Sequence, residues 1–354
     1  MILNILKVDF MKFNLRQSKL WTIWPVLLIA ALLSVASQAY AFRFVVMADS
    51  PDNETNKGGL NLACLEYLRG QILELNPRPD MVFFLGDLVT KAYQDLADPP
   101  DPAKRHYYIP DWKAAMAPLA QAGVKIYVSI GNRDLYPSKG WPPSKEMEQK
   151  FQEDFSDPPY FDMPDNGSPN YKKLAYSVAH ENAFFVVLDT FGFKPDGANY
   201  DNGLDAEQLA WFSGQARGAT QKFKFAFSHG PAFSPEGFAV GDSVKKTMWG
   251  IMEGAQFDAY FCGHEHIYSR WAITRATAPW ITRRITQVLT GAGGALPDQI
   301  FKVKQDRRKV HAFSLYNYVV GDVNENDAQF QAVGVDWNAG NYTARIIDRF
   351  ALQK

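Results

Sequence analysis

The sequence has few of the residues that would place it in a specialised class of protein. It contains two cysteines, Cys64 and Cys262, which excludes a disulfide framework and a metal site built from four thiolates. Each cysteine lies in an apolar segment, so we expect two buried thiols. Hydrophobic residues make up 47% and charged residues 21% of the 354 residues, which is the composition of a folded globular protein.

An excess of charge of one sign is lacking as well. The chain has 37 basic and 38 acidic side chains, for a formal net charge of −1. No run of basic residues follows the first 41 residues, so we expect no nucleic-acid partner.

The one long apolar run lies near the amino terminus. Basic side chains between residues 12 and 19 precede an apolar stretch at 21–36, and Ala39 and Ala41 then form a small-x-small pair. This order predicts a secretory signal peptide at 1–41 and an exported protein, periplasmic or secreted. The apolar run is shorter than the roughly 20 residues of a transmembrane helix. We therefore expect no stable membrane span after cleavage, and an uncleaved anchor is the alternative.

The remaining residues, 42–354, are expected to form one domain in which strands and helices alternate before a strand-rich tail. No linker interrupts this stretch, and the pattern predicts a layered α/β body around two sheets. The expected strands are 42–49, 80–87, 125–132, a hairpin at 174–190 turning at Glu181–Asn182, 222–229, 257–264, 284–294, 312–323, 330–337 and 341–348. The expected helices are 59–76, 112–123 (kinked at Pro118), 144–155 and 205–219, with Asp205 as the cap of the last.

Five of the expected strands end on a side chain that can bind a metal ion. In open α/β sheets, ligands bind outside the carboxyl ends of the strands, so these side chains are expected at one rim. Carboxylate and carboxamide oxygens with imidazole nitrogens suit Zn²⁺, Mn²⁺ or Fe. The set is Asp49, Asp87, Asn132, His229 and His264, with His266 two residues further on.

Each member of this set also has an ordinary explanation. An Asp after a strand is usually a turn former, a Gly-Asp or Gly-Asn pair is usually a turn, and a single His is usually structural. The joint occurrence of the set at successive strand ends favours a metal site. The other three histidines, His106, His180 and His311, lack such a setting and are interpreted as surface or core residues.

The order of the motifs resembles that of the calcineurin-like metallophosphoesterases. These motifs are Asp49, "GD" (86–87), "GN" (131–132), "SHGP" (228–231) and "GHEH" (263–266). The longer segment "GHEHIYSR" is especially similar to that of the purple acid phosphatases, a branch of this superfamily, and the resemblance covers residues 42–270. It implies a four-layer α/β/β/α sandwich, with two mixed β-sheets flanked by helices, that hydrolyses phosphate esters at a two-metal site.

The resemblance also implies a role for each ligand. Asp87 would bridge two metal ions (Fe, Zn or Mn); Asn132, His229 and His264 would hold one ion, and Asp49 and His266 the other. Two such ions lower the pKa of a bound water and clamp the phosphoryl oxygens. Arg133 and His264 are the expected catalytic side chains.

The sequence departs from the family pattern in two respects, and the first concerns the ligands of the ion at Asp49. Pro51 stands where most of the family has a histidine, two residues after Asp49, and Thr90 stands where purple acid phosphatases have a tyrosine. The Asp49 ion therefore lacks its usual fourth protein ligand and is expected to be held more weakly. Water, Ser50, Asp52 and Thr90 are the candidates to replace that ligand.

The second departure is Arg133, which follows Asn132 where the family usually has a histidine. A guanidinium binds phosphate oxygens with its planar fork but cannot act as a general acid. The alternative is that Arg133 simply pairs with Asp134 or another surface acid.

Taken together, the sequence predicts an exported metal-dependent phosphoesterase that acts on small-molecule phosphate mono- or diesters through a metal-activated water. The first alternative is a catalytically impaired protein that keeps the fold and binds phosphate compounds or nucleotides. The second is a lipid-surface or cell-wall protein anchored by an uncleaved amino terminus. The aromatic residues of the Pro-rich stretch 135–172 are expected either to line the substrate cleft or to pack onto the body; these are Trp141, Tyr160, Phe161 and Tyr171.

Overall fold

The structure is a computed structural model that describes residues 41–52, 59–94, 106–138, 141–193, 202–234, 239–299, 309–338 and 340–354. The chain divides into two compact units, Met1–Ala39 and Tyr40–Lys354, and every described residue belongs to the second. The expected signal peptide lies outside the described residues, except for Ala41. None of the described helices is long and apolar enough to cross a membrane.

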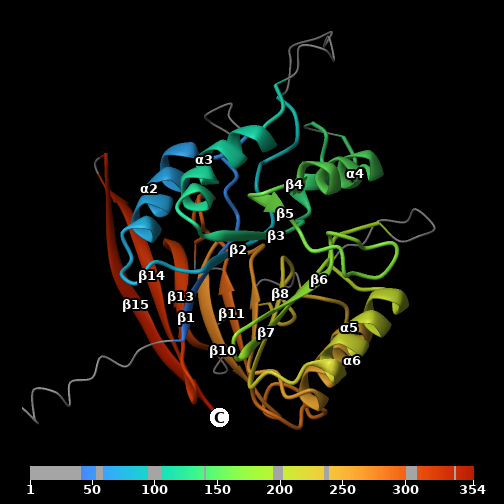
Figure 1. Cartoon of the computed structure of the whole chain (residues 1–354). Coiled ribbons are helices and arrows are strands. Elements are labelled where there is room, and N and C mark those ends of the chain that lie inside the picture. Colours follow the sequence, from blue (N-terminus) through green and yellow to red (C-terminus); the bar gives the residue numbers. More distant parts are fainter. Residues whose placement is uncertain are drawn as a thin grey trace, which may run out of the picture. The chain divides into compact units, whose positions relative to one another are not determined.

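The first of two large sheets is mixed and has the strand order β15-β14-β13-β1-β2-β3 (Figure 1). Its first three strands along the chain run parallel, and the carboxyl-terminal strands add to them as an antiparallel meander. The strands are β1 (Phe42–Met47), β2 (Met81–Leu85), β3 (Lys125–Ser129), β13 (Tyr316–Val323), β14 (Asp327–Asn338) and β15 (Asn341–Gln353).

The second sheet is also mixed, with the order β12-β10-β11-β9-β8-β7-β6. Its four central strands are parallel and its outer strands antiparallel. The strands are β6 (Tyr176–His180), β7 (Ala183–Leu188), β8 (Phe223–Ser228), β9 (Ala259–Cys262), β10 (Tyr268–Ile273), β11 (Ile285–Thr290) and β12 (Lys309–Phe313).

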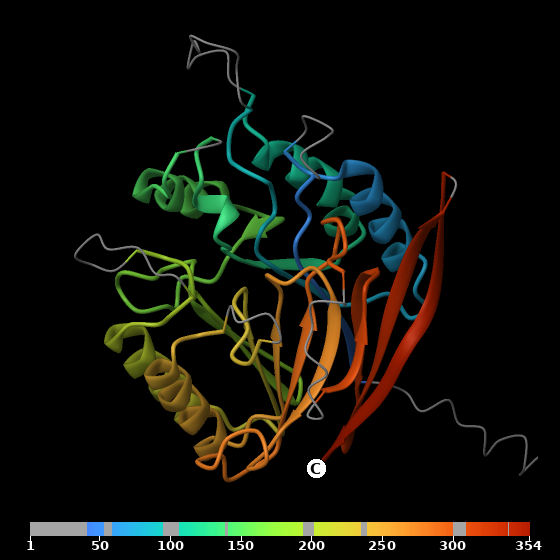
Figure 2. The ribbon, with the colours of Figure 1, turned by 180° about the vertical axis from the view of Figure 1, so that it is seen from behind.

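Helices cover the outer faces of both sheets (Figures 1 and 2). The first sheet is covered by α2 (Leu62–Leu73) and α3 (Ile109–Gln121), and the second by α5 (Ala206–Gly218) and α6 (Asp242–Gly254). A further segment after β3 contains the 3-10 turn Arg133–Leu135, α4 (Lys145–Asp154), β4 (Ser156–Asp157) and β5 (Phe161–Asp162). The predicted four-layer α/β/β/α architecture is confirmed.

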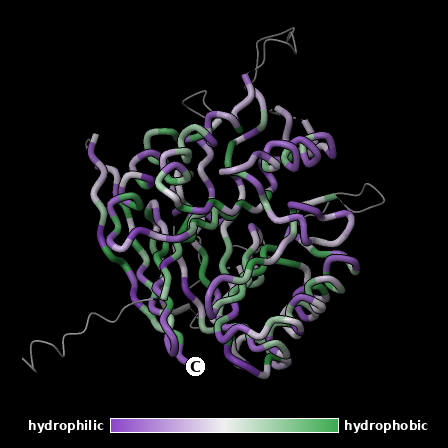
Figure 3. Tube along the Cα trace, in the orientation of Figure 1, coloured by the Kyte–Doolittle hydropathy of each residue, from purple (hydrophilic) through white to green (hydrophobic). Residues whose placement is uncertain are grey.

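Aromatic side chains fill the space between the two sheets. The rings of Phe83 on β2 and Phe227 on β8 stack at 4.3 Å with an interplanar angle of 7°, and Phe44 on β1 packs at 5.4 Å from Phe225. Apolar strands run through the middle of the fold and polar residues lie mostly outside (Figure 3). Strands buried on both faces explain the nearly continuous apolar runs of the sequence. Cys64 is buried with a free thiol, as is Cys262, which confirms that prediction.

Several local predictions are confirmed in detail. The Asp205 side chain accepts a hydrogen bond from the Gln208 backbone at 2.8 Å and so caps α5. The β6–β7 hairpin turns at Glu181–Asn182, where Glu181 has φ 49°. Pro118 lies inside α3, three residues before its last residue, Gln121, and the kink there stays a prediction.

A buried ion pair joins β10 of the second sheet to β15, the edge strand of the first sheet. The Arg270 guanidinium on β10 donates two hydrogen bonds to the Asp348 carboxylate on β15, at 2.5 and 3.0 Å, and the Tyr268 hydroxyl donates a third at 2.7 Å. Both charged residues are buried. The arginine of the "GHEHIYSR" segment therefore has a structural partner at the seam between the sheets.

Replacement of Asp348 by alanine should destabilise the fold strongly, because it leaves Arg270 buried without its partner. We expect the free energy of unfolding in urea to fall by about 3–5 kcal/mol. The control is Asp165→Ala, which breaks the exposed Lys172–Asp165 pair (3.7 Å) and should cost less than about 1 kcal/mol. Equal, small losses in both variants would show that the buried pair has no special role.

Candidate metal centre

The strand ends singled out by the sequence meet at one place. β1, β2 and β3 of the first sheet end beside β8 and β9 of the second, because the two sheets are stacked face to face. The His264 Nδ1 atom lies 3.0 Å from Asn132 Oδ1 and 3.2 Å from His229 Nε2. The ligand atoms of Asp87, His229 and His264 all lie within 4.8 Å of one another, a spacing suited to a metal ion.

The two remaining expected ligands adjoin this cluster. The Asp49 Oδ1 atom lies 3.9 Å from His229 Nε2 and 3.8 Å from His266 Nε2. Its other oxygen accepts a hydrogen bond from the His264 backbone at 2.9 Å. The structure thus brings all six expected metal ligands together.

The surroundings of the Asp49 carboxylate suit a bound cation. It is fully buried, and within the described part of the chain its Oδ1 atom has no hydrogen-bond partner. Buried polar atoms nearly always have a hydrogen-bond partner, so a buried oxygen without one indicates a site for a ligand. A neighbouring cation would compensate it.

His229 is fixed in the orientation of a metal ligand. Its Nδ1 atom lies 2.7 Å from the Leu85 carbonyl oxygen and donates to it, which points the Nε2 atom toward Asn132 and Asp87. A second hydrogen bond of this kind is how proteins set the tautomer of a ligating histidine. Because Leu85 belongs to β2 and His229 follows β8, the bond also crosses between the two sheets.

Three of the ligand residues have a left-handed backbone. Asp49 has φ 60°, Asp87 has φ 49° and His264 has φ 75°. For residues other than glycine this conformation costs free energy and tends to occur at functional sites. The strand ends are therefore bent so that these side chains face the cluster.

Glycines before two of the ligands allow the backbone to approach the carboxylates closely. A Cβ atom on Gly131 would lie 2.4 Å from the Asp87 backbone nitrogen and 2.5 Å from its Oδ1 atom. A Cβ atom on Gly263 would lie 2.4 Å from Asp49 Oδ2. The "GN" and "GH" pairs are thus a packing requirement of the centre as well as turns.

Burial and neighbouring charges shift the pKa values of the cluster. Burial acts to raise the pKa of Asp87, but the His229 imidazole beside it holds that pKa well below the usual range. Burial acts to lower the pKa of His229, but Asp87 and Asp49 raise it to about 9. Burial raises the pKa of Asp49, whereas burial and His229 lower the pKa of His264 to about 3, so this imidazole is neutral.

Two of the candidates to replace the ligand missing at Pro51, Ser50 and Thr90, make other contacts. The Ser50 hydroxyl donates to the Leu88 carbonyl oxygen at 2.7 Å, and the Thr90 hydroxyl donates to the Asp52 carbonyl oxygen at 3.3 Å. Both hydroxyl protons are therefore used to join the loops after β1 and β2. The Pro51 side chain itself is buried.

Arg133 lies at the edge of the cluster. Its Nε atom is 3.6 Å from Asp87 Oδ2, and its side chain remains 42% exposed. Asp134 is buried and accepts hydrogen bonds from the Leu88 and Gly131 backbones, both at 2.9 Å. Asp134 therefore ties the two ligand loops together with both its oxygens, and the guanidinium faces Asp87 and solvent.

Two neighbours of the ligands were not predicted from the sequence. The Phe191 ring packs against His229 and His264, with centroid separations of 5.3 and 5.2 Å, and forms an apolar wall. The Asp298 carboxylate accepts a hydrogen bond from the His266 backbone at 2.9 Å. Both lie in loops, where no periodic pattern or motif marks them.

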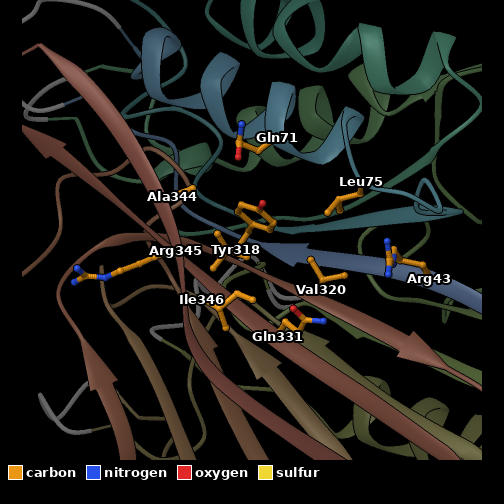
Figure 4. A pocket seen from close by; sticks show the side chains of 10 residues that line it. Arg43, Gln71, Leu75, Tyr318, Val320, Gln331, Ala344, Arg345 and Ile346 are labelled. Carbon is orange, nitrogen blue, oxygen red and sulfur yellow. The ribbon is translucent and has the colours of Figure 1, made fainter. Parts of the chain in front are cut away.

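Two of the four aromatic side chains in the stretch after β3 pack onto the body, whereas a place in a substrate cleft stays a prediction for the other two. Phe161 and Tyr171 are buried in the body, whereas Trp141 is 56% and Tyr160 45% exposed. Trp141 lines a hollow of about 520 Å³ together with Tyr93 and three prolines. A different hollow, of about 280 Å³, lies between α2 and the first sheet and is lined by Tyr318 and Ile346 but by none of the expected ligands (Figure 4).

Comparison with known proteins identifies the family. The model of the calcineurin-like phosphoesterase family matches residues 42–268. The chain belongs to this family. No curated protein matches it in sequence.

Solved structures agree with this assignment. The purple acid phosphatase PPD1 of yellow lupin aligns with a TM-score of 0.64 and 16% identity over 88% of this chain and 53% of its own. PhoD aligns with a TM-score of 0.61 and 12% identity, covering 90% of this chain and 70% of PhoD. GAP50, the anchor in the inner membrane complex of Plasmodium, aligns at 0.57 and 13% over 89% of each chain. These likenesses show the fold, and the chain spans about half the length of the lupin enzyme.

The family is metal-dependent, and Asp87, His229 and His264 form the candidate metal site of this member.

Replacement of Gly131 by alanine should weaken metal binding, because the added Cβ collides with the Asp87 backbone and carboxylate. We expect the affinity for Zn²⁺ or Mn²⁺, measured by calorimetry, to fall by about 10–100-fold, as for other changes that displace a ligand. The control is Gly250→Ala in α6, where an added Cβ meets nothing within 4 Å; it should bind metal normally. Unchanged affinity in the Gly131 variant would contradict this account of the centre.

Proposed function

We propose that the protein is an exported phosphoesterase that hydrolyses small-molecule phosphate mono- or diesters at a two-metal site. The observation that supports this most is the convergence of six metal-binding side chains from both sheets around the orphan oxygen of Asp49. The mixture of carboxylate, carboxamide and imidazole donors suits Zn, Mn or Fe. Export rests on the signal-like segment at 1–41.

Each ligand has a proposed place in this centre. Asn132, His229 and His264 would hold one ion, Asp49 and His266 the other, and Asp87 both. The second ion would be the more weakly bound, because Pro51 supplies no ligand. When bound, the ions would lower the pKa of a water molecule and compensate the charge of the phosphoryl group.

The protein's own side chains would orient the substrate. The Arg133 guanidinium, half exposed beside Asp87, is placed to bind non-bridging phosphate oxygens through charged hydrogen bonds. It remains protonated and cannot supply a proton to the leaving group. His264 is neutral because its pKa is about 3, so it serves as a ligand and hydrogen-bond partner. Protonation of the leaving group would then fall to solvent, which favours esters of acidic alcohols such as phenols.

The second candidate function is phosphate or nucleotide binding without turnover. Pro51 favours binding without turnover, because proline supplies no ligand to the ion beside Asp49. The fold also occurs in GAP50, which is described as an anchor.

Turnover of an aryl phosphate and a bis-aryl phosphate, each with Mn²⁺, Zn²⁺, Fe or a chelator, tests the proposal. We expect hydrolysis that the chelator abolishes. Arg133→Ala should lower kcat/KM by about 100-fold, the usual loss when one donor to a charged transition state is removed. Arg275→Ala, at an exposed surface position, should leave it unchanged.

Metal binding and hydrolysis, measured in the wild type and in ligand variants, distinguish the enzyme from the binding protein. In an enzyme, Asp87→Asn and His229→Gln should abolish both metal binding and hydrolysis. A wild-type protein that binds metal and phosphate but hydrolyses neither ester under any condition would overturn the proposed activity in favour of the binding function.

A further inference from the structure

Two buried carboxyl groups lie directly behind the wall of the metal centre. Glu148 on α4 is 5% exposed and Asp189, just after β7, is fully buried. A Cβ atom on Gly192 would lie 2.0 Å from Asp189 Oδ2 and 2.8 Å from Glu148 Oε1. Both carboxylate oxygens therefore lie near the same point, on the side of Gly192 where a side chain would project.

The same two groups hold the residues on either side of Gly192. The Phe191 backbone donates a hydrogen bond to Asp189 Oδ1 at 2.9 Å, and the Phe193 backbone donates one to Glu148 Oε1 at 2.7 Å. The Phe191 ring is the wall that packs against His229 and His264. The position of this wall therefore depends on two carboxyl groups that touch neither ligand.

The main chain of Asp189 is held from the other side. The Gln208 side chain on α5 accepts from the Asp189 backbone nitrogen and donates to its carbonyl oxygen, both at 2.8 Å. Repulsion between the carboxyl groups would therefore displace Glu148 and the segment 191–193, because Asp189 itself is fixed to α5.

A buried pair of this kind is stable only while it holds a proton, since two ionised carboxylates in contact repel each other in a medium of low dielectric constant. Over the part of the chain that the structure describes, Asp189 Oδ2 has no hydrogen-bond partner. This oxygen is the natural place for a proton shared with Glu148.

The charges around the pair agree with this arrangement. Burial and the Glu148 charge raise the pKa of Asp189 to about 8, and the Asp205 carboxylate at the start of α5 adds to the shift, while the Phe191 and Gly192 amides oppose it. Burial raises the pKa of Glu148 to about 7, against the opposing effects of the Phe193 amide and of Lys145 on the same helix.

We propose that Glu148 and Asp189 are positioning residues: they share a proton, hold the Phe191 wall against His229 and His264, and release it when the proton is lost. Loss of the proton replaces an O–H···O bond by repulsion between the Glu148 and Asp189 carboxylates. The wall then loosens and water reaches the imidazoles. Only the effect on turnover rests on the proposed function, and the effects on stability and backbone protection do not.

The sign of the pH effect follows from the raised pKa values. Between the ordinary carboxyl range and about pH 8, the folded protein binds a proton that the unfolded chain has already lost. Stability therefore falls as the pH rises through this window. For one proton, the unfolding equilibrium constant rises by up to tenfold per pH unit.

The experiment measures urea unfolding and hydrogen exchange of the Phe191 and Phe193 amides between pH 6 and pH 9. In the wild type, stability and amide protection should fall across this range. Glu148→Gln supplies a permanent N–H donor in place of the shared proton and removes one of the two titrating groups, so both profiles should become shallower, and Asp189→Asn should have the same effect. Glu153→Gln, at an exposed position on the same helix, should keep the wild-type profiles.

The alkaline limb of aryl phosphate turnover is measured on the same proteins and should move upward by about one pH unit or more in Glu148→Gln. If no protein turns over the ester but the unfolding and exchange profiles become shallower as expected, the proposed activity fails and the positioning pair stands. If the two amide variants keep the wild-type pH dependence of unfolding and exchange, the positioning pair is overturned, whatever the activity.

Discussion

The metal centre depends on the stacking of the two sheets over their aromatic core. Phe83 and Phe227 stack ring on ring between β2 and β8, and each strand ends a few residues later on a ligand, Asp87 or His229. The same registration places His229 Nδ1 at 2.7 Å from the Leu85 carbonyl oxygen of the opposite sheet. A shift of one sheet relative to the other would separate these partners. The close packing of the core therefore fixes the distances between ligands that are far apart in the sequence.

Several features of the centre are locally unfavourable for the stability of the fold. It combines left-handed backbones at Asp49, Asp87 and His264 with an orphan carboxylate oxygen and buried charge. Features of this kind persist where the surrounding structure over-determines them. Here the surroundings include the glycines whose lack of a side chain allows the backbone to approach the carboxylates. They also include Asp134, which is hydrogen-bonded to both ligand loops, and the Arg270–Asp348 pair between the two sheets.

The parts that could be predicted from the sequence are those encoded in continuous segments. An apolar run that stops on Asp49 or His229 predicts a strand and a candidate ligand at its end, so the two sheets and the candidate ligand set followed from the pattern, whereas the four-layer order followed from the family resemblance. Helix α6 and strand β10 were not predicted. α6 carries its buried residues Met248, Trp249 and Met252 among lysines and glycines, and β10 follows the "GHEH" motif within a few residues.

The contacts that escaped prediction join distant segments. Phe191 touches His264, Glu148 reaches Phe193, and Asp298 binds the His266 backbone. Nothing local in the sequence marks such pairs, because each depends on how the loops pack once the sheets have formed. Arg133 shows the same limit: the predicted partners were phosphate, Asp134 or another surface acid, and the structure places it beside the buried Asp87.

The central claim is that the strand ends of both sheets form one metal centre. Anomalous diffraction from crystals of the metal-loaded protein tests it most directly. The account predicts a strong peak between His229 Nε2, His264 Nδ1, Asn132 Oδ1 and Asp87, with a weaker one beside Asp49 and His266. Crystals that contain metal but show no peak among these side chains would contradict it.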